Sequence, residues 1–317
     1  MNAMNKVYTR LDTMKASTGR RSLGRAAARL MLGAAYLAAA AVRGGPGVGF
    51  HLTMARFAAG LLGSDLPKSE IHALLIAPMD SFRYFEFDFF WRSVVARDSL
   101  GDYLDVSSPR LFNWRVLCSG KTRRAVISNP DGNDLAATTR LFRAARIAGQ
   151  CELRGSLVSE LNEAPESFDT VVCISVLEHI PSEHAVAALA TLWGLLKPGG
   201  RLLLSVPCAR EGFEEYIDFN EYGLLRPDDD EFVFGQRFYD EPMLADQILA
   251  ITGTPSRRAV FGEKIPGTFV RNRQEKLRDP HYASWREPYT MATQYGHFER
   301  IQTLPGLGVI AMEFVKP

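Results

Sequence analysis

Apolar and polar residues follow two different periods along most of the chain from residue 100 onward. Short runs of consecutive apolar residues have the length of buried strands, and segments with apolar residues at helical spacing alternate with them. The expected strands cover residues 102–107, 123–128, 151–156, 168–175 and 201–207, and the expected helices cover 109–117, 134–149 and 182–196. This alternation predicts an α/β protein with a Rossmann-like, mostly parallel sheet and helices on both of its faces.

The pattern changes after Pro207. Residues 209–240 are rich in aromatic and acidic side chains and show little periodicity, so we expect an insertion that covers or faces a substrate. Further on, a helix is expected at 241–253, strands at 257–263 and 307–315, and a second insertion at 264–303. We therefore divide the chain into an N-terminal extension, 1–66, and one α/β domain, 67–317.

The first 66 residues differ from the rest in charge. Their only acids are Asp12 and Asp65, whereas Arg21, Arg25 and Arg29 lie on one stripe of a predicted helix. The apolar run that follows, LMLGAAYLAAAAV, is shorter than the roughly 20 residues that a membrane-spanning helix needs. We expect a basic, partly disordered helical extension. Three interpretations stay open: peripheral contact with an anionic membrane, helices packed on the core, and a transit peptide.

Composition excludes several classes of function. The net charge of +1 gives no signature of nucleic-acid binding, and the six histidines show no spacing typical of a zinc site, so we expect neither nucleic acid nor metal as a ligand. The four cysteines form no CxxC pair, and a chain of 317 residues does not need a disulfide framework. We expect reduced thiols and a cytoplasmic location, with membrane association as the open addition.

Two later segments carry a resemblance to a known family. The sequence ESFDTVVCISVLEHIP is followed by ALATLWGLLKPGGRLLLSVP, and the spacing between the two is close. Together they resemble the fourth and fifth strands of class I S-adenosylmethionine-dependent methyltransferases, and the resemblance spans residues 83–207. It implies S-adenosylmethionine as the cofactor and an antiparallel last strand. RYFEF at 83–87 is similar to a segment that covers the cofactor in some members.

The resemblance also implies a cofactor site at the carboxyl ends of the strands. Asp105 matches the family's acid at the end of the first strand, near the methionine part of the cofactor. Ser107 and Pro109 stand where the family has its first two loop glycines. We expect Ser108 to cap the next helix and Pro109 to begin it, since Ser favours the N-cap and Pro the first helical position. S-adenosylmethionine has no phosphate, so this loop does not need to cradle one.

The other acids of the family's site are replaced in this chain. Asn129 stands where an acid binds the ribose hydroxyls, with Asp131 and Asp134 close enough to substitute, and Ser156 stands where an acid contacts the adenine. The residues that the resemblance implies as cofactor-binding are Asp105, Ser107, Ser108, Asn129, Asp131, Ser156, Leu157 and Ser175.

Methyl transfer from a sulfonium demands little catalytic apparatus, because orienting the acceptor in line with the methyl group supplies much of the rate. A base is needed only for an acceptor that must lose a proton. His179 is the candidate for that base; the alternative is a structural role for this histidine within the LEHIP segment. We expect methyl transfer to a small-molecule or glycan-type acceptor. The alternative is a catalytically inactive, methyltransferase-like binding or scaffold protein.

Overall fold

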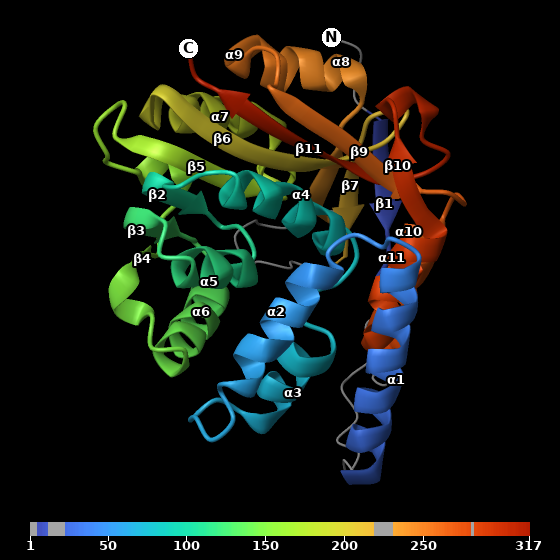
Figure 1. Ribbon diagram of the computed structural model, residues 1–317. Coiled ribbons are helices and arrows are strands. Elements are labelled where there is room, and N and C mark those ends of the chain that lie inside the picture. Colours follow the sequence, from blue (N-terminus) through green and yellow to red (C-terminus); the bar gives the residue numbers. More distant parts are fainter. Residues whose placement is uncertain (1–4, 12–22, 219–230, 280–281) are drawn as a thin grey trace.

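The computed structural model describes residues 5–11, 23–218, 231–279 and 282–317 (Figure 1). Among these residues, eight strands form one mixed sheet. In spatial order they are β10 (Tyr295–Phe298), β9 (Arg257–Glu263), β11 (Gly308–Val315), β6 (Leu196–Cys208), β5 (Phe168–Ile174), β2 (Gly101–Val106), β3 (Thr122–Ser128) and β4 (Glu152–Arg154). The strands from β6 to β4 are parallel to one another, whereas β11 is antiparallel to both β6 and β9. The predicted fold class, with its antiparallel last strand, is confirmed.

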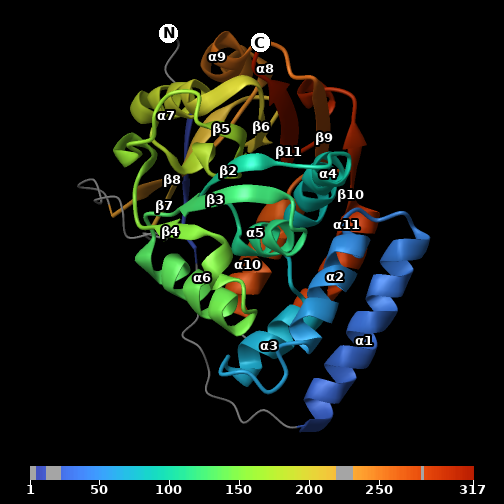
Figure 2. The same cartoon turned by 60° about the vertical axis from the view of Figure 1, so that its left-hand side comes forward.

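Helices cover both faces of this sheet (Figures 1 and 2). One face carries α4 (Arg83–Val95), α5 (Arg110–Cys118) and α6 (Gly132–Ala144), and the other carries α7 (Ser182–Leu195) and α8 (Glu241–Leu244), which continues through a π turn (Ala245–Leu249) into α9 (Ala250–Thr252). Side chains of β5 alternate between the two cores: Val172 and Ile174 pack on the first face, and Val171 and Cys173 on the second. This alternation explains why a strand buried on both faces appears in the sequence as an unbroken apolar run.

The N-terminal part forms three helices, α1 (Leu23–Val42), α2 (Val48–Ala59) and α3 (Lys68–Ile76). They extend away from the sheet, and α1 lies beside α11 (Glu287–Gln294) (Figure 1). The break between α1 and α2 depends on Gly47, which has φ of 69° and lies so close to Tyr84 that a Cβ would come within 2.3 Å of the Tyr84 carbonyl oxygen. Only glycine fits both conditions.

A second, three-stranded sheet was not predicted. It consists of β1 (Asn5–Thr9), β7 (Phe213–Ile217) and β8 (Val233–Phe238), with β7 in the middle. Part of the N-terminal extension therefore pairs with the insertion at 209–240. Residues 219–230, which include Phe219, Tyr222 and most of the acidic run, lie outside the described residues. The insertion at 264–303 forms α10 (Thr268–Arg278), a 3-10 turn η5 (Ser284–Arg286), α11, β10 and the turn η6 (Ile301–Thr303).

Several element ends differ from those expected. Helix α6 ends at Ala144, ahead of Gly149, because Arg146 adopts the left-handed conformation with φ of 59°. Ser182 does not cap α7, since it is already helical and donates a hydrogen bond to Glu214. Within the described residues, no helix is long and apolar enough to cross a membrane.

Candidate active site

The strand order reverses between β2 and β5, and their carboxyl ends lie side by side. Ser107 follows β2 with φ of 50°, and Ser175 follows β5 with φ of 49°. A non-glycine residue in this left-handed region costs about 1 kcal/mol or more. Two strained residues at one switch point mark the place where an open α/β sheet binds ligands. The positive φ of Ser107 explains why the family has a glycine at this position.

The loop after β2 is fixed by Ser108. Its backbone N–H donates to Asp105 Oδ1 at 3.1 Å, and its hydroxyl oxygen accepts from the backbone N–H of Ile174 at 2.9 Å. The expectation that Ser108 caps α5 was wrong, because the N-cap is Pro109 and no side chain caps this helix. The Ser108 side chain instead joins the loop to the end of β5, so the two strands that frame the switch point are held together.

Asp105 lies beneath this loop and is completely buried. Burial raises the pKa of its carboxyl to about 7, although the neighbouring Asn113 and Ser108 lower it. Among the described residues, Asp105 Oδ2 has no hydrogen-bond partner. The Asp105 carboxyl therefore stabilises the loop by accepting the hydrogen bond from the Ser108 amide.

Beyond β3, the side chains form a network of their own. Asn129 donates to Asp134 Oδ2 at 2.9 Å and accepts from the backbone N–H of Asp131 at 2.9 Å. Asp131 caps α6 by accepting from the backbone N–H groups of Asn133 and Asp134, at 2.8 and 3.3 Å. Arg110, at the start of α5, forms an ion pair with Asp134. The structure thus brings Asn129, Asp131 and Asp134 together, and adds Arg110, which sequence analysis missed.

The end of β4 contributes a smaller polar contact and an exposed apolar side chain. Ser156 accepts a hydrogen bond from Ser128 through its carbonyl oxygen at 2.8 Å, and the two hydroxyl groups lie 2.9 Å apart. Leu157, three residues beyond the edge strand β4, is 45 % exposed.

A buried carboxylate, Glu86 on α4, connects this region to the next strand. Its Oε1 accepts hydrogen bonds from the hydroxyl groups of Ser175 and Ser205, at 2.5 and 2.6 Å, and its Oε2 pairs with Arg83 at 2.7 Å. Ser205 was not predicted, and its only sequence signal is a hydroxyl residue in an otherwise apolar strand. The network places α4 over the carboxyl ends of β5 and β6.

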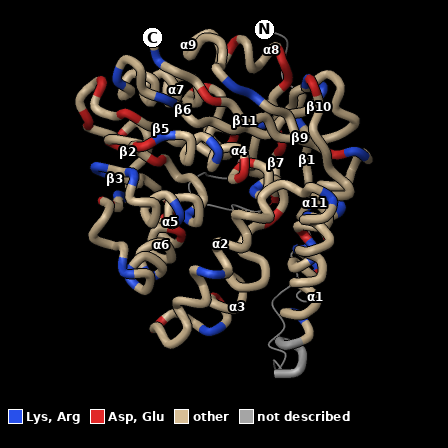
Figure 3. Tube along the Cα trace, in the orientation of Figure 1, with Lys and Arg blue, Asp and Glu red and all other residues tan. Residues whose placement is uncertain are grey.

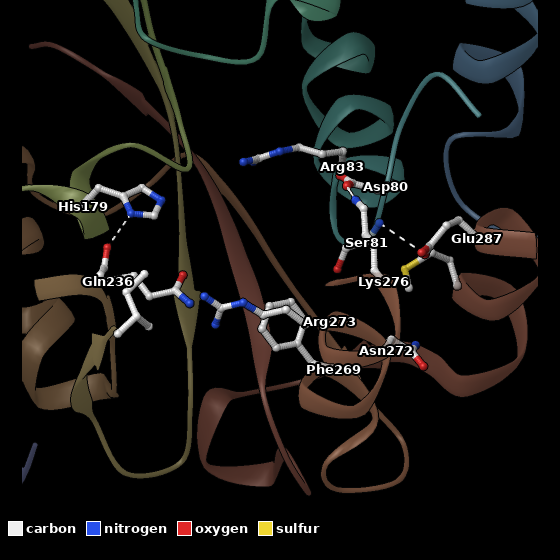
Figure 4. A pocket seen from close by; sticks show the side chains of 13 residues that line it. Asp80, Ser81, Arg83, His179, Gln236, Phe269, Asn272, Arg273, Lys276 and Glu287 are labelled. Atoms are coloured by element: carbon white, nitrogen blue, oxygen red, sulfur yellow. Dashed lines mark hydrogen bonds and ion pairs between the residues drawn. The ribbon is translucent and has the colours of Figure 1, made fainter. Parts of the chain in front are cut away.

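A cavity of about 250 Å³ lies next to this network (Figure 4). His179 and Arg83 form one side of it, and side chains of α10 and α11, including Phe269 and Met291, form another. Its lining residues are Asp80, Ser81, Arg83, His179, Ile217, Gly235, Gln236, Phe269, Asn272, Arg273, Lys276, Glu287 and Met291. Residues of the insertion at 209–240 and of the one at 264–303 both line this cavity.

The ring of His179 has a defined tautomer. Its Nδ1 lies 2.7 Å from the carbonyl oxygen of Gly235, and a carbonyl oxygen only accepts, so Nδ1 carries the proton. The Nε2 atom then holds a lone pair, at 3.8 Å from Glu178 Oε1. Burial lowers the pKa of His179 to about 4 and raises the pKa of Glu178 to about 8. The imidazole is therefore neutral at pH 7 and presents an acceptor nitrogen.

The basic residues of the cavity all have acidic partners. Arg273 binds Glu215 at 2.8 Å, and Lys276 pairs with Asp80, where burial lowers the pKa of the lysine. Paired charges of this kind give polarity to the walls without a strong net charge. Among the described residues, no group of three His, Cys, Asp or Glu side chains could hold a metal ion.

Comparison with known proteins agrees with this geometry. Residues 128–202 match the family model of a methyltransferase domain, a stretch that runs from the end of β3 into β6. The chain is 32 % identical over 117 residues to a ubiquinone biosynthesis O-methyltransferase of Xylella fastidiosa, covering 33 % of this chain and 46 % of that protein. It is 46 % identical over 57 residues to the enzyme of that name from Xanthomonas euvesicatoria, covering 18 % and 23 %. The chain thus matches less than half the length of these relatives.

Two solved methyltransferase structures with bound S-adenosylhomocysteine are also similar. The first is N-methyltransferase NodS of Bradyrhizobium japonicum, with 12 % identity and a TM-score of 0.45, covering 84 % of this chain and 98 % of that one. The second is 1,6-didemethyltoxoflavin-N1-methyltransferase of Burkholderia thailandensis, with 17 % identity and a TM-score of 0.46, covering 81 % of this chain and 88 % of that one. Residues 128–202, which belong to the Rossmann-like sheet, match a methyltransferase domain, and the predicted resemblance to S-adenosylmethionine-dependent methyltransferases is confirmed.

Proposed function

We propose that this protein transfers the methyl group of S-adenosylmethionine to a hydroxyl group of a small molecule. The observation that carries the proposal is the position of the methyltransferase-domain match. It runs from the end of β3 into β6, so it includes the end of β5, on one side of the switch point, and the His179 turn beside the cavity. The cofactor side and the acceptor side of a transfer reaction would therefore meet at one edge of the sheet.

The residues at this edge fit the cofactor. Ser107, with its left-handed backbone, and the hydroxyl group of Ser175 would face the methionine part of the cofactor. The hydrogen bond between Asp105 and the Ser108 amide would hold the loop in place. Asp131 and Asn129 would hold the ribose. When bound, S-adenosylmethionine supplies an activated methyl group on a sulfonium, which needs no phosphate-binding loop.

The adenine end of the cofactor would lie at β4. The exposed Leu157 offers an apolar surface for the base, and Ser156 offers a hydroxyl group for its edge. Neither residue is charged, so binding at this end would depend on apolar burial and neutral hydrogen bonds. A neutral hydrogen bond contributes about 0.5–1.5 kcal/mol, against about 1.5–3 kcal/mol for a charged one.

His179 would act as the base for the acceptor. The acceptor hydroxyl group would give its proton to Nε2 and keep the electron pair of the O–H bond on oxygen. The oxygen would bond to the methyl carbon that the cofactor supplies, while the bond between sulfur and that carbon would break with its electron pair left on sulfur. A base with a pKa of about 4 cannot deprotonate a hydroxyl group in advance. The proton would move late, because the oxygen becomes acidic only as it gains the methyl group.

The cavity supports a small acceptor. Its volume of about 250 Å³ is near the lower end of small-molecule sites, and Phe269 and Met291 offer apolar contacts. The relatives named as O-methyltransferases favour a hydroxyl group as the methylated site. A glycan-type acceptor, also expected from the sequence, carries hydroxyl groups as well and stays a second candidate. Peripheral contact with an anionic membrane also stays a proposal.

Turnover with labelled S-adenosylmethionine tests the reaction. The acceptor set should contain small phenols with one or two hydroxyl groups and simple sugars, and transfer should depend on His179. If the protein is instead an inactive scaffold, no acceptor should give a labelled product. Labelled product from amines alone would instead contradict the hydroxyl acceptor.

A further inference from the structure

Helix α1 exposes an unbroken apolar face. The segment Leu30–Val42 contains no charged residue, and its single hydroxyl group, on Tyr36, belongs to a ring that packs against Trp285 and Tyr289 at centroid distances of 5.1 and 5.3 Å. The packed side of the helix consists of Gly33, Tyr36, Leu37 and Ala40, and the outer side of Met31, Ala35, Ala38 and Val42. The outer positions recur at helical spacing and form one stripe.

The exposure of this stripe is unusual for a globular protein. Met31 is 76 % exposed and Val42 is 87 % exposed, and Leu30 and Leu32 are each more than 40 % exposed. Figure 3 shows α1 without acidic residues along its described length. A contiguous apolar face of this kind indicates a surface that is covered in the working state of the protein.

Charge identifies what covers it. Residues 13–64 contain seven lysines and arginines and no acid, although the whole chain has a net charge of only +1. Arg29 precedes the apolar segment and Arg43 follows it. An apolar helix face bordered by cations matches the interface of a bilayer that contains anionic lipids. Two antiparallel copies of α1 would instead bring Arg29 of one beside Arg43 of the other, which is repulsive.

We propose that the outer face of α1 binds the surface of an anionic lipid bilayer. The helix lies along the surface, since no helix among the described residues meets the length and hydropathy needed to span a membrane. Anionic lipid headgroups pair with the cations at its two ends, and the apolar stripe enters the boundary between headgroups and acyl chains.

Helix α11 lies between this surface and the cavity. The inner side of α1 packs on α11, through Tyr36 against Tyr289 and through the Arg43 guanidinium over the Tyr289 ring at 5.0 Å. The same helix α11 supplies Glu287 and Met291 to the cavity. If the proposed function holds, a lipid-soluble hydroxyl compound is the acceptor class that this arrangement serves, because it partitions into the bilayer beside the site.

Vesicle flotation with the full chain tests the proposal. The protein should float with vesicles of phosphatidylcholine and phosphatidylglycerol, remain free with phosphatidylcholine alone, and bind less at high salt. Met31→Glu and Val42→Glu should each weaken binding about tenfold or more, since each removes one buried apolar side chain. Replacing both Arg29 and Arg43 by Gln should weaken the preference for anionic vesicles.

The matched control is Val186→Glu on α7, a 39 % exposed valine on the other side of the sheet (Figure 1). It should bind vesicles as the unaltered protein does, and melting temperatures verify that every variant is folded. Absence of vesicle binding by the unaltered protein overturns the proposal. So does a dimer that Met31→Glu converts to monomer without any vesicle binding. Vesicle binding without methyl transfer would overturn the proposed function and leave the membrane surface standing.

Discussion

Replacing Asp105 by Asn should change how the stability of the protein depends on pH. The carboxyl is completely buried and its pKa is raised from 3.8 to about 7 by burial. The folded state therefore holds a proton that the unfolded state releases between these two values. This contribution to stability is fully present below pH 3.8 and is lost as the pH rises through about 7. Asn keeps an acceptor for the Ser108 amide and cannot ionise.

The size of the effect follows from the two pKa values. A change from 3.8 to about 7 corresponds to a loss of the order of 4 kcal/mol in the free energy of unfolding by pH 8. Urea unfolding of both proteins at steps from pH 4 to pH 8 measures it, with Asp131→Asn at the start of α6 as the control. The stability of Asp105→Asn relative to the unaltered protein should rise from pH 4 to about pH 7 and then level off. Parallel stability curves would refute the assignment of a neutral Asp105.

Three further predictions concern the site. Ser107→Gly should raise the free energy of unfolding by about 0.5–1 kcal/mol, because it relieves a left-handed φ of 50°, and thermal unfolding would detect the gain. A lower melting temperature would show that the serine hydroxyl contributes more to stability than its backbone conformation costs. Asp105→Ala should weaken S-adenosylhomocysteine binding more than Asp131→Ala, as judged by calorimetry, and equal or reversed effects would show that the cofactor does not depend on the strand end at Asp105. His179→Ala should lower kcat by about 10²-fold or more with cofactor affinity unchanged, and equal kcat values would show that the histidine takes no part in the reaction. Because the pKa of His179 is about 4, the activity of the unaltered protein should not depend on His179 protonation above about pH 5.

The sheet could be predicted from the sequence because local patterns determine it. Strands β2, β3, β5 and β6 contain runs whose side chains are buried in the two cores, so hydrophobicity alone indicates them. The small sheet was missed because it depends on pairing over a long distance. Asn5 in β1 pairs with Phe213 in β7, and the side chains of β1 are largely exposed, so no apolar period marks this strand.

The site was predictable to the level of the strand ends and not beyond. The sequence places Ser108 and Ser182 before helices, where a capping role is the local preference, yet tertiary partners take both hydroxyl groups. Ile174 and Glu214 are remote in sequence from these serines, so their contacts cannot be inferred from neighbouring residues. The buried Glu86 network and the Arg110–Asp134 pair were missed for the same reason.

Isothermal calorimetry with S-adenosylhomocysteine measures whether the cofactor binds at the strand ends. The unaltered protein should bind one equivalent at the switch point between β2 and β5, and Leu157→Glu, beyond the end of β4, should weaken that binding. Absence of heat at millimolar S-adenosylhomocysteine, from protein that is folded by its melting curve, would show that the strand ends hold no cofactor.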